Sequence, residues 1–308
     1  MSSAISQENG VARRRRAGPM MSPEFRTTLV LLAPSLALLS FVIAYPVVRG
    51  FVYTFTNDSL LKAGRFVGID NYIHLFEDHA FWHSLGFSAL FAAANVVGCY
   101  LLGLGLAVVL QKDFPGRGVF RVMLLTPWIV PSLVAVTSWR WMVSDDGALV
   151  NKIIVALGGD PIYFLSSSAW TIAIVILVKI WVSFPFMMLS LLASLQAVDR
   201  TLYEAAEIDG ATPWQAFCHV TCPEIKGVSI VLCVLMTIWT VNDFDTPWLF
   251  ARGGPANATE NLVVLAYRYT FARNDVGMGA TVSFVTLFIL MALFLVVMKI
   301  SKGATNEK

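Results

Sequence analysis

Long stretches without a single charged side chain constrain this sequence more than any other feature. Four such runs lie at residues 27–48, 84–110, 122–139 and 276–298. A helix needs about 20 apolar residues to cross the hydrocarbon layer of a membrane, which is about 30 Å thick. The four runs therefore predict membrane-spanning segments, in agreement with a chain that is 57% hydrophobic and only 14% charged.

Two further spans are predicted where an apolar stretch contains or borders few charges. Residues 169–195 hold Lys179 as their single charge, and the span at 226–250 has Asp243 and Asp245 near its far end. Inside lipid only helices and closed barrels satisfy every backbone polar group, and these runs lack the alternation of barrel strands. We therefore predict an all-α polytopic membrane protein with six transmembrane helices. The predicted parts are a tail at 1–26, the six-helix domain at 27–300 and a second tail at 301–308.

The distribution of positive residues predicts the orientation, because Lys and Arg near span ends stay on the cytoplasmic side. With the N-terminus inside, cytoplasmic segments hold thirteen of these residues and outer segments hold six. The predicted topology is N-in and C-in, with both tails cytoplasmic. The run Arg13–Arg16 is then an orientation anchor rather than a nucleic-acid patch. The first apolar run is too long for a signal-peptide core, so we expect it to be retained.

Residues suited to catalysis or metal binding do not gather in this sequence. Cys218, His219 and Cys222 are too few for a metal site without a second cluster. The cysteines also predict no disulfide framework. An intramembrane enzyme would need a facing nucleophile and base, and we predict neither a catalytic residue nor a metal ligand. The sequence also lacks the G-x-x-x-x-G-K-[ST] phosphate loop, so this chain is not expected to hydrolyse ATP.

The cytoplasmic loop at 199–224 has the signals of two short helices. Thr201 and Glu204 have the spacing of a capping box, and the run 212–215, Thr-Pro-Trp-Gln, predicts a second helix start. Gly210 between them suits a left-handed helix end. We therefore predict a rigid helix-turn-helix at the cytoplasmic surface.

The same loop resembles the EAA loop of the permease subunits of ABC importers. The resemblance rests on Glu-Ala-Ala at 204–206, Asp-Gly-Ala at 209–211 and the final Pro223. It departs from the family at Cys222, where Leu is usual, and at Gly227, which is often a second Pro. The resemblance implies that the loop inserts into a groove of a cytoplasmic ATPase, with Glu204 meeting a basic partner. The coupling residues implied are Glu204, Ala205, Ala206, Asp209, Gly210, Ala211 and Pro223.

Further motifs resemble the maltose and glycerol-phosphate branch of carbohydrate-importer permeases, over roughly residues 25–300. They lie at 66–72, 184–187, 242–245 and 253–259. The resemblance implies a type I ABC importer permease fold in the bacterial inner membrane and a sugar or sugar derivative as solute. It implies three partners: a second permease forming a heterodimer, a cytoplasmic ATPase dimer and an extracytoplasmic solute-binding protein. ATP and Mg²⁺ would lie on the ATPase, and no cofactor on this chain.

A self-sufficient secondary transporter of a small polar solute is the alternative. Such carriers often contain two related halves with interrupted helices. No convincing internal repeat is visible in this sequence, so we favour the interpretation of the chain as an importer subunit.

Polar and aromatic groups at membrane depth are candidates for the solute path, because such groups usually face a cavity or a partner. The candidates are Asn242, Trp239, Asp243, Asp245, Trp181, Lys179 and Asn95. The tryptophans are equally explained as packing or interface aromatics, and the aspartates as caps of the fifth span. Lys179 needs a counter-charge, which an anionic solute or one of the two aspartates would provide, and we favour the internal pair.

Overall fold

The structure is a computed structural model that describes residues 23–144 and 147–305, so the predicted anchor Arg13–Arg16 lies outside the described residues. The described part is helical and contains no strand, only one isolated bridge between Thr56 and Phe66. The chain divides into two units, residues 1–50 and 51–308. Each unit is described by itself.

The described part of the first unit is one helical segment that continues into α2. It consists of α1 (Pro23–Leu39), a π-helical turn (Ser40–Ala44) and the part of α2 (Tyr45–Tyr53) up to Gly50. Its apolar stretch, Val30–Tyr53, has 24 residues and is long enough to cross a membrane. The predicted first span is therefore present as a helix.

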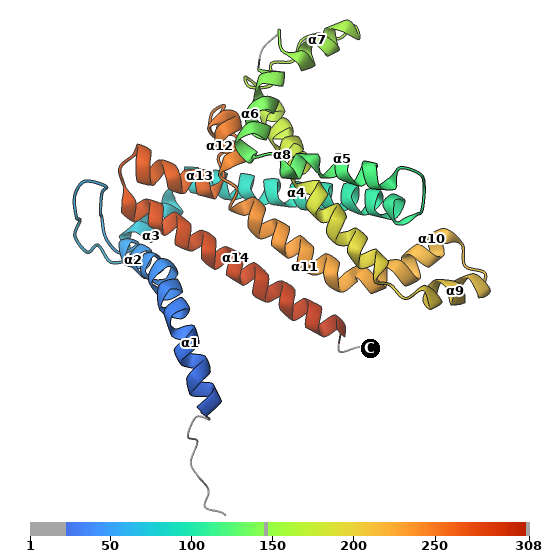
Figure 1. Cartoon of the computed structure of the whole chain (residues 1–308). Helices are drawn as coiled ribbons and strands as arrows, with labels where there is room; N and C mark the ends of the chain where they lie inside the picture. The colour runs from blue at the N-terminus through green and yellow to red at the C-terminus, as the bar shows by residue number, and fades with distance from the viewer. Residues whose placement is uncertain (1–22, 145–146, 306–308) are drawn as a thin grey trace, which may run out of the picture. The chain divides into compact units, whose positions relative to one another are not determined.

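The second unit contains long helices joined by short ones (Figure 1). The long helices are α4 (His79–Gln111), α8 (Ser168–Gln196), α11 (Cys222–Val241) and α14 (Val276–Thr305). The shorter ones are α3 (Asp70–Glu77), α5 (Arg117–Ile129), α6 (Ser132–Val143), α7 (Leu149–Ala156), α9 (Arg200–Ile208), α10 (Pro213–Ala216), α12 (Asp245–Ala251) and α13 (Leu262–Tyr267), with π-helical turns at Phe217–Thr221 and Arg268–Ala272.

The main core of this unit lies between α4, α8 and α11. Met187 and Met188 of α8 are fully buried there, beside Cys99 of α4 and Met236 of α11. A Cβ atom added to Gly103 would lie 2.9 Å from the backbone nitrogen of Met188. The glycine thus permits the close approach of α4 and α8, as small residues do between membrane helices.

The predicted span at 122–139 is not one helix, which corrects the prediction. It is the pair α5 and α6, bent by 91° at a short break. Pro131 has no N–H to donate, and proline pushes the residue before it out of the helical region. Val130 accordingly has ψ 130°, so the helix must end there.

The predicted fifth span at 226–250 has different ends. A continuous helical segment runs from Pro213 to Val241, and α12 follows as a separate helix. The helix ends where polar residues begin, and the Asp243 carboxylate accepts a hydrogen bond from the Thr246 N–H at 3.3 Å, at the start of α12. Counting the bent pair as one span, the described residues provide six candidate spans.

Candidate functional site

The first helix of the cytoplasmic loop, α9, is capped by Asp199. Its carboxylate accepts a hydrogen bond from the Thr201 N–H at 2.9 Å, so the predicted capping box of Thr201 and Glu204 is wrong. This bond and one to the Thr201 side chain hold the pKa of Asp199 below its usual value. The Glu204 carboxylate instead lies 3.3 Å from Arg200 Nε, one turn earlier, and both side chains are exposed. Glu204 is therefore accessible from the cytoplasmic side.

The turn after α9 has the geometry that was predicted. Gly210 is left-handed, with φ 77°, and its N–H donates to the Glu207 carbonyl at 3.0 Å. The Ala211 N–H donates to the Ala206 carbonyl at 2.9 Å, which completes a Schellman motif. The helix that follows starts with the predicted capping box of Thr212 and Gln215. The whole turn is therefore fixed by local hydrogen bonds.

The two parts of the loop enclose a groove of about 480 Å³. Small side chains leave this space open, above all Ala205, Ala206, Ala211 and Ala216. The Tyr203 hydroxyl lies 2.9 Å from the Thr221 hydroxyl and links the two parts of the loop. The Glu-Ala-Ala and Asp-Gly-Ala triplets thus shape one accessible depression. Of the predicted coupling residues, Ala205, Ala206, Asp209, Gly210 and Ala211 line it.

The predicted helix-turn-helix needs one correction, because its second helix does not end. α10, the π-helical turn and α11 form one helical segment from Pro213 to Val241, which includes Pro223. At about 1.5 Å per residue, its 29 residues extend roughly 43 Å. A displacement of the loop would therefore pass directly into a membrane-spanning helix.

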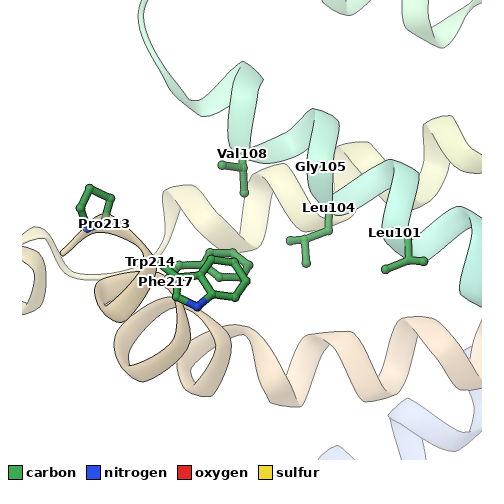
Figure 2. A pocket seen from close by; sticks show the side chains of 7 residues that line it. All are labelled: Leu101, Leu104, Gly105, Val108, Pro213, Trp214 and Phe217. Carbon is green, nitrogen blue, oxygen red and sulfur yellow. The ribbon is translucent and has the colours of Figure 1, made fainter. Parts of the chain in front are cut away.

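An apolar hollow of about 500 Å³ separates the start of this segment from α4 (Figure 2). Leu101, Leu104 and Val108 line it from α4, opposite Trp214 and Phe217. The Trp214 and Phe217 rings stack with centroids 5.6 Å apart. The loop end is thus not packed tightly against the second span, which leaves it room to shift.

The charged residues predicted for the solute path differ in their contacts. Lys179 Nζ lies 2.9 Å from Asp243 Oδ2, and the two side chains are only 14% and 9% exposed. The internal pair that we favoured is therefore formed. Asp245 is exposed and accepts a hydrogen bond of 2.5 Å from the Ser132 hydroxyl of α6.

The uncharged candidates also differ in exposure. Asn95 is fully buried and donates a hydrogen bond of 2.8 Å to the Thr240 hydroxyl, which joins α4 to α11. Asn242 is exposed and donates to the Ile238 carbonyl at 2.9 Å. The exposed Asn242 can therefore offer its amide oxygen to a solute, whereas the buried Asn95 side chain joins two packed helices.

The aromatic candidates lie in two separate groups. Trp239 is 45% exposed, and its ring centroid is 4.9 Å from that of Phe186. The Trp128 ring centroid also lies 5.9 Å from that of Phe186, so both tryptophans contact Phe186, and we call these three rings the aromatic ledge. Trp181 instead packs edge-on against Trp139, 5.6 Å away.

The sequence interpretation missed Glu260 and Asn261 on the outer segment. Glu260 is 2% exposed and paired with Arg268; burial raises the pKa of its carboxyl, and Arg268 opposes that rise. Asn261 caps α13 and donates to the Asp243 carbonyl at 2.6 Å. The sequence signal that could have identified them is an acidic residue and an amide residue directly before the apolar residues of α13. Asn261 therefore links the start of α13 to the residues that follow α11, whereas the Glu260–Arg268 pair lies within the outer segment.

Comparison with known proteins identifies the class. The profile of the family described as "Binding-protein-dependent transport system inner membrane component" matches residues 99–305. The trehalose/maltose transport system permease protein of Thermococcus litoralis is 32% identical over 280 residues, covering 91% of this chain and 95% of that protein. The sulfoquinovosyl glycerol transport system permease protein of Agrobacterium fabrum is 34% identical over 275 residues, covering 88% of this chain and 89% of that protein.

The fold agrees with that class. A bacterial ABC transporter that imports the acidic polysaccharide alginate has a chain with TM-score 0.80 and 19% identity, covering 90% of this chain and 95% of that one. A bacterial alginate ABC transporter in complex with an alginate pentasaccharide-bound periplasmic protein has a chain with TM-score 0.81 at 18% identity, covering 91% of this chain and 95% of that one.

The family profile and the relatives thus define the class as ABC-importer permeases, which are multi-pass proteins of the inner membrane and are not themselves catalytic. The chain belongs to the family of binding-protein-dependent transport system inner membrane components. The predicted family and fold class are confirmed, and the alternative of a self-sufficient secondary transporter is not favoured.

Proposed function

We propose that this chain forms half of the membrane path of an importer for a sugar or sugar derivative. The observation that carries the proposal is the grooved loop at 199–224, which continues without interruption into the segment Pro213–Val241. The exposed Glu204 and the Ala-lined groove offer an ATPase a shaped surface with a charge beside it. Movement of that surface turns a cytoplasmic event into a rearrangement inside the membrane.

A carbohydrate is the solute class that best fits the exposed polar and aromatic groups. The ledge of Trp128, Phe186 and Trp239, together with the exposed Asn242 three residues after Trp239, provides apolar faces and a hydrogen-bonding group. Small-molecule sites are generally lined by aromatic side chains with few polar groups that fix orientation. The names of the relatives, which refer to trehalose, maltose and sulfoquinovosyl glycerol, support the same class.

The energy source is a separate subunit in this proposal. No phosphate-loop motif occurs in the sequence, so ATP and Mg²⁺ are assigned to a partner ATPase. ATP binding closes the ATPase pair, the loops approach each other, and the path opens outward. Coupling requires that the ATPase binds the two permease states with different free energies. The partners proposed are a second, different permease subunit, an ATPase dimer and an extracytoplasmic solute-binding protein.

The proposed solute does not need a negative charge. The Asp243 carboxylate lies 2.9 Å from the Lys179 ammonium and neutralises it, so Lys179 does not need an anionic solute as its counter-charge. Uptake assays with matched neutral and anionic sugars test this point. A strong preference for the anion that disappears in Lys179→Met would contradict it.

Retention of partners tests the proposed function directly. The chain is isolated from its native membrane in mild detergent as wild type, Glu204→Ala and Glu207→Ala, and the retained proteins are identified by mass spectrometry. Glu207 is an exposed glutamate of the same helix that lies outside the Glu-Ala-Ala and Asp-Gly-Ala triplets, which makes it the matched control. Truncating one partner of an interfacial charge pair costs several kcal/mol, so we expect at least roughly tenfold less ATPase with Glu204→Ala only. Recovery of the chain alone in all three samples would contradict the proposal.

A further inference from the structure

A second groove lies between α11 and α14, and it shares no lining residue with the coupling loop's groove or with the aromatic ledge. Figure 1 shows the two helices running beside each other. The groove has a volume of about 360 Å³. Its walls are mostly apolar and include Ile230, Val234, Leu293 and Val297.

The end of the groove nearer the cytoplasm carries its one charged side chain, while Thr237 at the other end donates its hydroxyl hydrogen to the Cys233 carbonyl at 2.8 Å. The Tyr100 hydroxyl donates a hydrogen bond of 3.1 Å to the Ser229 hydroxyl within the lining. Lys226 lines the groove one turn before Ser229, and its side chain is exposed. Within the residues that the structure describes, Lys226 makes no ion pair or hydrogen bond. The groove therefore combines an apolar slot with one uncompensated positive charge.

The depth of Lys226 follows from the helix and the topology. Lys226 lies fifteen positions before the outer end of α11 at Val241, which corresponds to roughly 22 Å of helix. With both termini inside, as the positive residues predict, the Lys226 end of the groove lies in the cytoplasmic half of the membrane. A lysine at this depth extends its ammonium toward the headgroup layer.

We propose that this groove binds an anionic phospholipid of the inner leaflet. Its phosphate pairs with Lys226, and an acyl chain lies along Val234, Leu293 and Val297. Basic pockets between membrane helices on the cytoplasmic side select headgroups with net negative charge. The inference depends on the membrane placement of α11 and α14 and is independent of the solute that the importer carries.

Charge complementarity favours a lipid over a second protein chain as the occupant. A helix of another subunit that covered the groove would bury Lys226 and would have to supply an acidic residue against it. A lipid phosphate supplies that charge at the correct depth, and its chain is as apolar as the walls. The lipid would also lie against the helix that continues from the coupling loop.

Lipid retention on the purified, assembled complex tests the proposal. Native mass spectrometry is used to compare phosphatidylglycerol with phosphatidylcholine on wild type, Lys226→Gln and Lys112→Gln. Lys112 is an exposed lysine at the cytoplasmic end of α4 that does not line the groove. We expect wild type and Lys112→Gln to retain phosphatidylglycerol preferentially, and Lys226→Gln to retain about fivefold less. Excess inorganic phosphate should not displace the lipid; displacement would identify a phosphate site instead.

A second measurement needs no variant. Cys222 and Cys233 line the groove, whereas Cys218 does not. Phosphatidylglycerol should slow maleimide labelling of the two groove cysteines and leave Cys218 unchanged, while phosphatidylcholine should have little effect. Equal retention of both lipids by wild type and Lys226→Gln would overturn the proposal. Crosslinking of Cys233 to a second permease subunit in the intact complex would overturn it as well.

Discussion

The coupling loop and the outer segment at 242–275 are held in shape in opposite ways. In the loop the ordering contacts are local, such as Asp199 with Thr201 and Thr212 with Gln215. In the outer segment the partners come from distant helices. Asp243 pairs with Lys179, the Leu262 N–H donates to Ser88 at 2.9 Å, and Tyr269 bonds to Asp78.

This difference predicts two kinds of sensitivity. The loop keeps its own conformation and leaves its surface free for a partner, so a change there should harm coupling more than stability. The outer segment is part of the packed unit, so a change there should lower the stability of the whole chain. Each variant below is chosen to break or sharpen that contrast.

The largest effect on stability is expected from Lys179→Met. The substitution leaves Asp243 buried without its counter-charge, and breaking a buried pair from one side costs about 3 kcal/mol or more. We expect a markedly lower unfolding temperature in detergent, measured by a thermal scan of the purified chain, and reduced transport.

The matched control is the double variant Lys179→Met with Asp243→Asn. Removing both charges avoids the uncompensated carboxylate, so much of the lost stability should return. If the double variant were as unstable as the single one, packing of the lysine stem rather than the ion pair would be responsible.

A smaller effect, of the opposite kind, is expected from Gly210→Val in the loop. Gly210 has φ 77°. A residue with a side chain in this left-handed region raises the free energy of the folded state by about 1–2 kcal/mol, and the β-branched valine has no means of relieving that strain. Because the turn is local, the strain should distort the loop rather than unfold the chain. We expect an almost unchanged unfolding temperature together with weak ATPase retention.

Gly210→Asn provides the control for this prediction, because asparagine tolerates the left-handed region better than valine. It should retain most of the ATPase binding. A large drop in unfolding temperature for Gly210→Val would show that the loop is part of the cooperative unit and would remove the contrast.

Asp78→Asn should produce an effect of about 1 kcal/mol that depends on pH. Burial raises the pKa of Asp78, but hydrogen bonds from Tyr269 and the Ala80 N–H, with Arg273 nearby, outweigh it and leave the pKa lowered. A carboxyl whose pKa is lower in the folded state stabilises that state at pH values above its unfolded-state pKa. The stabilisation is lost as the pH falls through the folded-state pKa.

The variant should therefore be less stable than wild type near neutral pH and equal to it well below 3.8, the ordinary aspartate value. Thermal scans of both proteins across this range provide the measurement. A difference that stayed constant with pH would mean that the carboxylate charge is not what links the outer segment to α4.

The same contrast explains which features could be predicted from the sequence. The turn at Gly210 and the capping box at Thr212 were predicted correctly because each depends on residues a few positions apart. The cap at Asp199 was assigned two residues too late, since Thr201 with Glu204 fits the same spacing rule. Local patterns therefore specify the loop to within a few residues.

Features that depend on contacts between residues far apart in the chain were harder to predict from the sequence. A charge-free run does not reveal whether its helix is straight, so the 91° bend near Pro131 was missed although the proline is visible. The apolar residues after Asp245 suit lipid or protein equally, which placed the end of the fifth span too far along. The sequence offered two aspartates for Lys179, and only the fold selects Asp243.

The smallest effect is expected from Asp199→Ala, which removes the cap of α9 without touching the packed unit. The lowered pKa of Asp199 arises from its hydrogen bonds to Thr201, so its contribution is present above the unfolded-state pKa and disappears as pH falls. Hydrogen exchange should show faster exchange of the first-turn amides of α9 at neutral pH, with no change in α4 or α8. Because Asp199→Asn keeps a capping oxygen, it should largely restore protection. Faster exchange that spread into α11 would instead show that the loop and the membrane helix open together, as one mechanical element.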